Sequence, residues 1–102
     1  MKRGTTPIHT FKTSIDLSGA TVFVSYAQSG RVVVEKTGTD LDVTSESVTV
    51  RLSQKDTLKF NASCHLVHMQ IRCVFSDGTA DASDIMTADI ADVLKDGEIS
   101  YV

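Results

Sequence analysis

The chain has 102 residues, of which 41% are hydrophobic and 23% are charged, and its formal net charge is −3. This composition predicts a single globular domain over residues 1–102, and because no run approaches about 20 apolar residues it argues against a membrane span. The acids gather at one end: residues 77–102 hold seven Asp and Glu against one Lys. That balance argues against nucleic acid as a partner, because phosphate binding needs clustered Lys and Arg.

Apolar residues alternate with polar ones along most of the chain, which predicts β-strands rather than helices. In one strand Val22, Val24 and Tyr26 share a face, and Tyr26 is expected to point into the core. The predicted strands are, in chain order, residues 7–13, 21–27, 31–36, 41–43, 47–52, 66–75 and 82–90.

Turn residues mark the connections between these strands. Ser29-Gly30 predicts a tight hairpin, because glycine tolerates a positive φ without steric cost, and Asp77-Gly78 predicts a second one. Ser53 lies three residues before Asp56, as in a capping box, and predicts a helical turn over residues 53–58.

The two ends of the chain carry weaker patterns. Residues 1–6 have too little apolar content to join a core and are predicted to be flexible. Residues 88–95 fit either a helical turn that Gly97 stops or a continuing bulged strand, and the sequence leaves both open. Residues 98–102 either add an edge pairing or remain frayed.

Together these elements predict an all-β domain. Several short strands with regularly spaced turn signals are typical of an antiparallel sandwich. At this length we expect an immunoglobulin-like β-sandwich of about seven strands, with one or two short helical turns.

The strand over residues 66–75 separates two faces with different roles. Its apolar face contains Cys73, which is therefore predicted to pack in the core rather than act as a nucleophile. Its other face places His68, Gln70 and Arg72 together. If that face is exposed, these three residues are the candidate protein contact surface.

Groups that could carry catalysis or bind a metal do not converge in the sequence. His65 and His68 are separated by an odd number of residues, so a strand would place them on opposite faces. Adding His9 and Cys64 gives no recognisable ligand spacing. We therefore predict no catalytic residues, no metal site and no cofactor; a small hydrolase or metalloenzyme is the weakest alternative.

The cysteine content and the start of the chain bear on the compartment. Cys64 and Cys73 are too few for a disulfide framework. No apolar stretch follows Met1-Lys2-Arg3, so no signal peptide is expected. The chain is expected to fold in a reducing cytosol with free thiols.

Several stretches of the chain form one recognisable pattern: residues 3–11, 50–60, 70–72, 76–78, 82–85 and 93–99. Together they resemble a family of small proteins encoded in prophages of Gram-positive gut bacteria, among their tail genes. Residues 16–22 are also distantly similar to the N-terminal β-sandwich domain of phage baseplate upper proteins.

The resemblance implies a phage structural protein, a tail or baseplate-associated module that acts through protein–protein contacts. Its partners would be other tail or baseplate proteins, or further copies of itself in a homo-oligomer, with no membrane partner. It would occupy the bacterial host cytoplasm during assembly and the virion tail afterwards. The resemblance brings no catalytic residues.

A small carbohydrate-binding β-sandwich module is the alternative function. Sugar sites of this kind present exposed aromatic platforms. The chain has no Trp, and its two tyrosines are Tyr26 and Tyr101, of which Tyr26 is expected to be buried.

Overall fold

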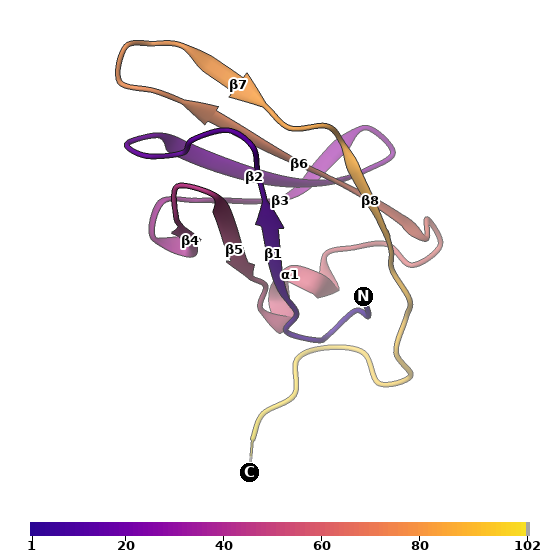
Figure 1. The fold of residues 1–102 in the computed structure, drawn as a ribbon. Coiled ribbons are helices and arrows are strands. Elements are labelled where there is room, and N and C mark those ends of the chain that lie inside the picture. Colours follow the sequence, from indigo (N-terminus) through magenta and orange to yellow (C-terminus); the bar gives the residue numbers. More distant parts are fainter. Residues whose placement is uncertain (102) are drawn as a thin grey trace.

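Strands form where the sequence alternates, and a computed structural model describes them over residues 1–101 (Figure 1). Two short helical segments also occur, the 3₁₀ turn η1 (Gly38–Asp40) and the helix α1 (Gln54–Leu58). The eight strands of the described residues are β1 (Ile8–Lys12), β2 (Thr21–Gln28), β3 (Arg31–Thr37), β4 (Leu41–Val43), β5 (Ser47–Arg51), β6 (Leu66–Val74), β7 (Ala80–Ala82) and β8 (Met86–Asp89).

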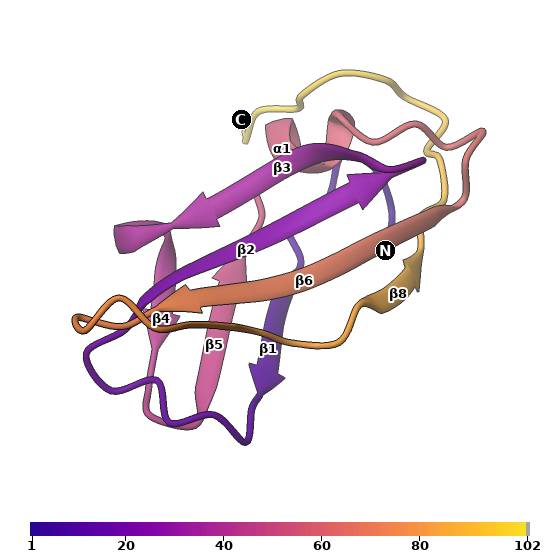
Figure 2. The same ribbon diagram turned by 90° about the horizontal axis from the view of Figure 1, so that it is seen from above.

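The strands form two antiparallel sheets that lie one over the other (Figure 2). The smaller sheet has the order β1-β5-β4, and the larger has the order β3-β2-β6-β7, with β8 also paired to β6. In the immunoglobulin fold, strands B, E and D share one sheet, while C′, C, F and G share the other. The same order here confirms the predicted immunoglobulin-like β-sandwich.

The core lies between the two sheets and is filled by the inward residues of both. Tyr26 is fully buried, as predicted, and its ring meets Phe60 edge-on with centroids 6.2 Å apart. Cys73 is also buried, as predicted. The other buried apolar residues are Leu17, Val22, Val24, Val34, Leu41, Val48, Val50, Leu52, Val67, Met69, Ile71 and Ile90.

The predicted turn chemistry is confirmed at two connections. Ser29 and Gly30 both have positive φ, 51° and 75°, which is the requirement of the two-residue hairpin turn whose twist matches the strands. The capping box is present at α1: the Asp56 N–H donates to Ser53 Oγ at 3.0 Å, and the Ser53 N–H donates to Asp56 Oδ2 at 2.9 Å.

The single strand predicted over residues 82–90 is wrong, because the chain forms two strands, β7 and β8, separated by residues 83–85. Arg72 pairs with Ala82, whereas Met69 pairs with Met86. Two residues of β6 therefore lie opposite three residues of the returning chain, which is a bulge. The Ser83 hydroxyl accepts the Ile71 N–H at 3.0 Å and so satisfies the interrupted ladder.

The first residues of the chain lie against its last quarter. Lys2 forms an isolated parallel bridge with Ala91. The Arg3 guanidinium donates to the Leu58 and Phe60 carbonyls at 3.0 and 2.8 Å and pairs with Asp92 at 2.7 Å. The flexibility expected for residues 1–6 stays a prediction, but these contacts give the segment a defined place beside β8.

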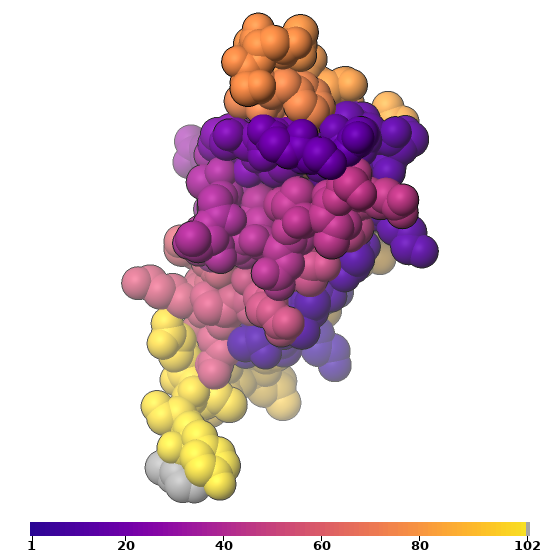
Figure 3. All heavy atoms as spheres, turned by 60° about the vertical axis from the view of Figure 1, so that its left-hand side comes forward, coloured from indigo at the N-terminus to yellow at the C-terminus, as the bar shows by residue number. Residues whose placement is uncertain are grey.

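Of residues 88–95, which fitted either a helical turn or a continuing strand, residues 88 and 89 are strand, as the end of β8, and residues 92–95 are neither. Residues 98–101 form no edge strand, and Val102, the last residue of that possible pairing, lies outside the described residues. Residues 92–101 leave the sandwich at one end of the molecule, opposite the end that carries the β6–β7 hairpin (Figure 3). The Gln54 side chain holds this segment, donating to the Ile99 carbonyl at 3.1 Å and accepting its N–H at 2.9 Å. Among residues 1–101, no helix has the length and apolar character needed to cross a membrane.

A largely buried ion pair joins α1 to the larger sheet. Lys36 Nζ on β3 lies 2.9 Å from Asp56 Oδ2, and both side chains are mostly covered. Burial alone would raise the pKa of the Asp56 carboxyl, but the Ser53 N–H and the Lys36 ammonium outweigh it and hold that pKa below its usual value. Asp56 therefore serves as both a helix cap and a counterion.

We expect Asp56→Ala to lower the free energy of unfolding by about 2–4 kcal/mol, because it removes the cap and leaves Lys36 without its counterion. Urea denaturation followed by circular dichroism would measure the loss. Asp42→Ala, which removes an exposed carboxylate from β4, is the matched control and should stay within about 0.5 kcal/mol of the parent. Equal losses in the two variants would contradict the assigned role.

A second polar contact lies at the edge of the core. His9 Nδ1 on β1 lies 2.8 Å from the Tyr26 hydroxyl oxygen. Burial raises the pKa of the Tyr26 hydroxyl, so this group keeps its proton and can donate it to a neutral imidazole. Burial also lowers the pKa of His9 below its usual value.

The lowered pKa of His9 determines how the free energy of unfolding changes with pH. Because the pKa of His9 is lower in the folded than in the unfolded chain, the unfolded chain binds the proton first as the pH falls below about 6.5. We expect the free energy of unfolding to decrease over that range, before the carboxylates titrate. His9→Gln should flatten the dependence in urea titrations, whereas His65→Gln at an exposed position should preserve it. An unchanged slope in His9→Gln would contradict this assignment.

Candidate functional site

The larger sheet has one face turned away from the core, which we call the outer face. The inward positions of β2 and β6 are fixed by burial, and the alternating positions between them point outward. The cross-strand register extends the same face onto β3. The outer face consists of Thr21, Phe23, Ser25, Ala27, Val32, Glu35, Thr37, Leu66, His68, Gln70, Arg72 and Val74.

The three residues predicted as a contact surface lie together on the outer face. His68, Gln70 and Arg72 pair with Ala27, Ser25 and Phe23 of β2, respectively. Arg72 is exposed, and the other two are half-buried. The face is thus exposed at Arg72 and partly covered at His68 and Gln70, and the contact role stays a prediction.

Gln70 has a further role in the bulge between β7 and β8. Its side-chain amide donates to the Ser83 carbonyl at 2.9 Å. This bond uses one of the polar groups of Gln70 to stabilise the fold, so Gln70 is a less available contact residue than Arg72.

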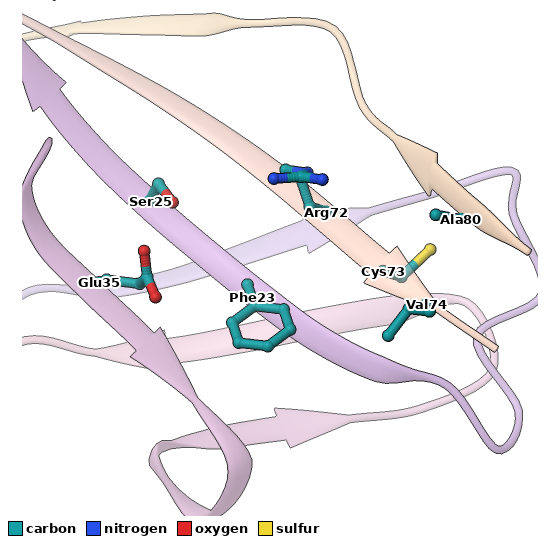
Figure 4. A pocket seen from close by; sticks show the side chains of 7 residues that line it. All are labelled: Phe23, Ser25, Glu35, Arg72, Cys73, Val74 and Ala80. Atoms are coloured by element: carbon teal, nitrogen blue, oxygen red, sulfur yellow. The ribbon is translucent and has the colours of Figure 1, made fainter. Parts of the chain in front are cut away.

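A shallow hollow of about 330 Å³ lies on the outer face beside Arg72 (Figure 4). Phe23 and Ser25 of β2 form its middle, between Glu35 on β3 and Arg72 on β6. Cys73, Val74 and Ala80 complete its lining. It therefore combines one aromatic ring, small apolar side chains and two opposite charges.

Sequence reasoning missed Phe23 and Glu35, because they lie on β2 and β3, whereas the candidate surface was predicted from the strand over residues 66–75 alone. A signal for Phe23 was available. If Val22, Val24 and Tyr26 point inward, the alternation places Phe23 on the outward side of its strand, and the pairing with β6 then places it beside Arg72. Glu35 could be placed only once the register of β3 on β2 was known.

The two charges beside the hollow have no ionic partner within the described chain. The ion pairs among residues 1–101 join Arg3 to Asp92 and Asp96, and Lys36 to Asp56. Arg72 and Glu35 are both exposed and stand on opposite sides of Phe23. They are available to a partner that presents a carboxylate and a cation at matching positions.

The histidines and cysteines are dispersed through the fold. His9 lies near Tyr26 at the edge of the core, His65 is exposed beyond β6, and His68 is on the outer face. Cys64 is half-buried, with its Sγ 3.5 Å from Ser29 Oγ. In the part of the chain that the structure describes, no three or more His, Cys, Asp or Glu side chains come together as metal ligands would.

No protein-family model and no curated protein matches the chain. Among solved structures, it is similar to the V domain of amphioxus IgVJ-C2, at 11% sequence identity and a TM-score of 0.38, over 91% of this chain and 97% of that chain.

The two faces of β6 should respond differently to truncation. Ile71→Ala removes a core side chain and should lower the free energy of unfolding by about 2–5 kcal/mol. Arg72→Ala, at the next position but on the outer face, should change it by less than about 0.5 kcal/mol. Urea denaturation of both variants gives the comparison; a loss for Arg72→Ala as large as that for Ile71→Ala would show that the outer face is structural.

Proposed function

We propose that this chain is a phage structural protein, a tail or baseplate-associated module that acts through protein–protein contacts made by its outer face. The resemblance to prophage tail-region proteins supports the setting, and the composition of the outer face supports the mode of action. In this setting the protein is assembled in the bacterial host cytoplasm and works without catalysis or a cofactor.

The hollow around Phe23 is the observation that carries the proposal. Interface centres are enriched in aromatic residues and Arg, and here Phe23 and Arg72 are cross-strand neighbours. Other exposed apolar side chains occur on the same face: Val74, 37% exposed, is two residues from Arg72 on β6, whereas Val32 (53%) and Leu66 (38%) lie toward the other end of the sheet. Such a surface suits a protein partner, because it offers apolar area at the centre with charges to orient the contact.

The carbohydrate alternative has less support from the side chains. Tyr26 is fully buried and cannot form a sugar platform. Phe23 is half-buried, and Tyr101, although fully exposed, lies in the extended segment after the last strand and away from the hollow. A clear hit on a glycan array would favour this alternative.

The test is binding to the products of the neighbouring genes, which the proposal expects to include tail and baseplate proteins. The tagged wild-type chain should retain at least one of them in a pull-down, and calorimetry would then give its affinity. Phe23→Ala and Arg72→Ala should each weaken that binding about tenfold or more, as truncated interface anchors do. Arg51→Ala, an exposed arginine on the smaller sheet, is the control and should bind normally.

Two results would contradict the proposal. One is the absence of binding to any neighbouring tail gene product. The other is retained affinity in both outer-face variants, which would place the contact elsewhere on the molecule.

A further inference from the structure

From the charges around the hollow, we infer that the outer face binds a second copy of this chain in a two-fold symmetric dimer. This inference rests on the proposed function, because it names the occupant of the same outer face. A closed two-fold contact requires a surface that is complementary to itself. The positions of Arg72 and Glu35 meet that requirement.

The register fixes where the two charges stand. Arg72 on β6 pairs with Phe23 on β2, and Glu35 on β3 pairs with Ser25, two residues further along β2. A line from Arg72 to Glu35 therefore crosses β2 between Phe23 and Ser25. Consider a two-fold axis that lies in the contact plane and crosses the midpoint of this line at a right angle. Rotation about it places Arg72 of one copy over Glu35 of the other.

With that axis, each copy presents the opposite charge to its mate. Arg72 of one copy meets Glu35 of the second, and Glu35 of the first meets Arg72 of the second. The dimer thus gains two equivalent ion pairs from groups that make none within residues 1–101. An arginine opposite a carboxylate can form two parallel hydrogen bonds, which favours this orientation over others.

The apolar residues of the hollow then lie at the centre of the contact. Phe23 and Ser25 flank the axis, so the two Phe23 rings come close to it from both copies. Covering them removes exposed aromatic surface from water, while the ion pairs stand on either side. An aromatic centre flanked by complementary charges is the usual anatomy of a specific interface.

The size of the outer face predicts how strong the dimer is. The three strands of the outer face, about 4.8 Å apart and about eight residues long, cover about 380 Å² per copy, or about 760 Å² in the dimer. That area is below the size of stable specific interfaces and within the range of weak, transient contacts. We therefore expect a weak, concentration-dependent dimer rather than a permanent one.

Charge exchange provides the test. Arg72→Glu gives a chain with two acids at these positions, and Glu35→Arg gives one with two arginines, so each variant alone should repel its own copies. Sedimentation equilibrium should show at least tenfold weaker self-association for each variant than for the wild type. An equimolar mixture of the two variants should associate again, because the ion pairs re-form between unlike chains.

Controls separate this result from misfolding or a general charge effect. Circular dichroism should show that both variants remain folded, as expected for exposed positions. Arg51→Glu makes the same charge change on the smaller sheet and should dimerise like the wild type.

A wild-type chain that stays monomeric up to about 1 mM, or a variant mixture that stays monomeric, would overturn the inference. Retained dimerisation in either single variant would also overturn it, because the dimer would then use another surface. A monomeric wild type that still binds tail proteins through Phe23 would leave the proposed function standing alone. A chain that neither self-associates nor binds tail proteins would contradict both the dimer and the proposed function.

Discussion

The antiparallel pairing of β2 with β6 is the constraint on which the rest of the molecule depends. It brings Tyr26 opposite Met69 on the inner side of the larger sheet and Phe23 opposite Arg72 on the outer side. Because side chains alternate with a period of two, a slip of one residue would exchange the two faces and bring Arg72 into the core. Burial of the inner residues therefore fixes the arrangement of the outer ones, so the proposed contact surface depends on the packing of the core.

Polar contacts elsewhere in the molecule join the loops and chain ends to the sandwich and do not contribute to the outer face. Asp56 caps α1 and pairs with Lys36, which ties the chain between β5 and β6 to the edge strand β3. Arg3 binds the carbonyls at the end of α1 and also Asp92, so the start of the chain, the helix and the segment after β8 meet at one place. These polar contacts lie away from the outer face, and that face keeps its charged residues free of partners within the described chain.

Local patterns in the sequence were sufficient to predict most of the elements but not which elements pair with one another. The alternation of residues 21–27 and 66–75 identified the inward residues, and Ser53 with Asp56 identified α1, because each signal lies within a few adjacent residues. The bulge opposite Gln70 and Ile71 was missed, because it depends on a register between distant segments and on the Ser83 hydroxyl that satisfies it. The hollow was missed for the same reason: Phe23, Glu35 and Arg72 come from three strands, and only the assembled sheet brings them together.

The balance of apolar and charged groups on the outer face decides what kind of contact it can make. A larger apolar area would bind more tightly but would leave the free chain prone to nonspecific association. Here the apolar part is small, and Arg72 and Glu35 flank it, so the proposed contact takes its orientation mainly from charge and is expected to weaken as salt is added. A weak contact of this kind gains strength when many copies are held in one particle, because each further contact forms at a high effective concentration. Such a surface suits a protein whose copies stay separate in dilute solution and bind one another once an assembly brings them together.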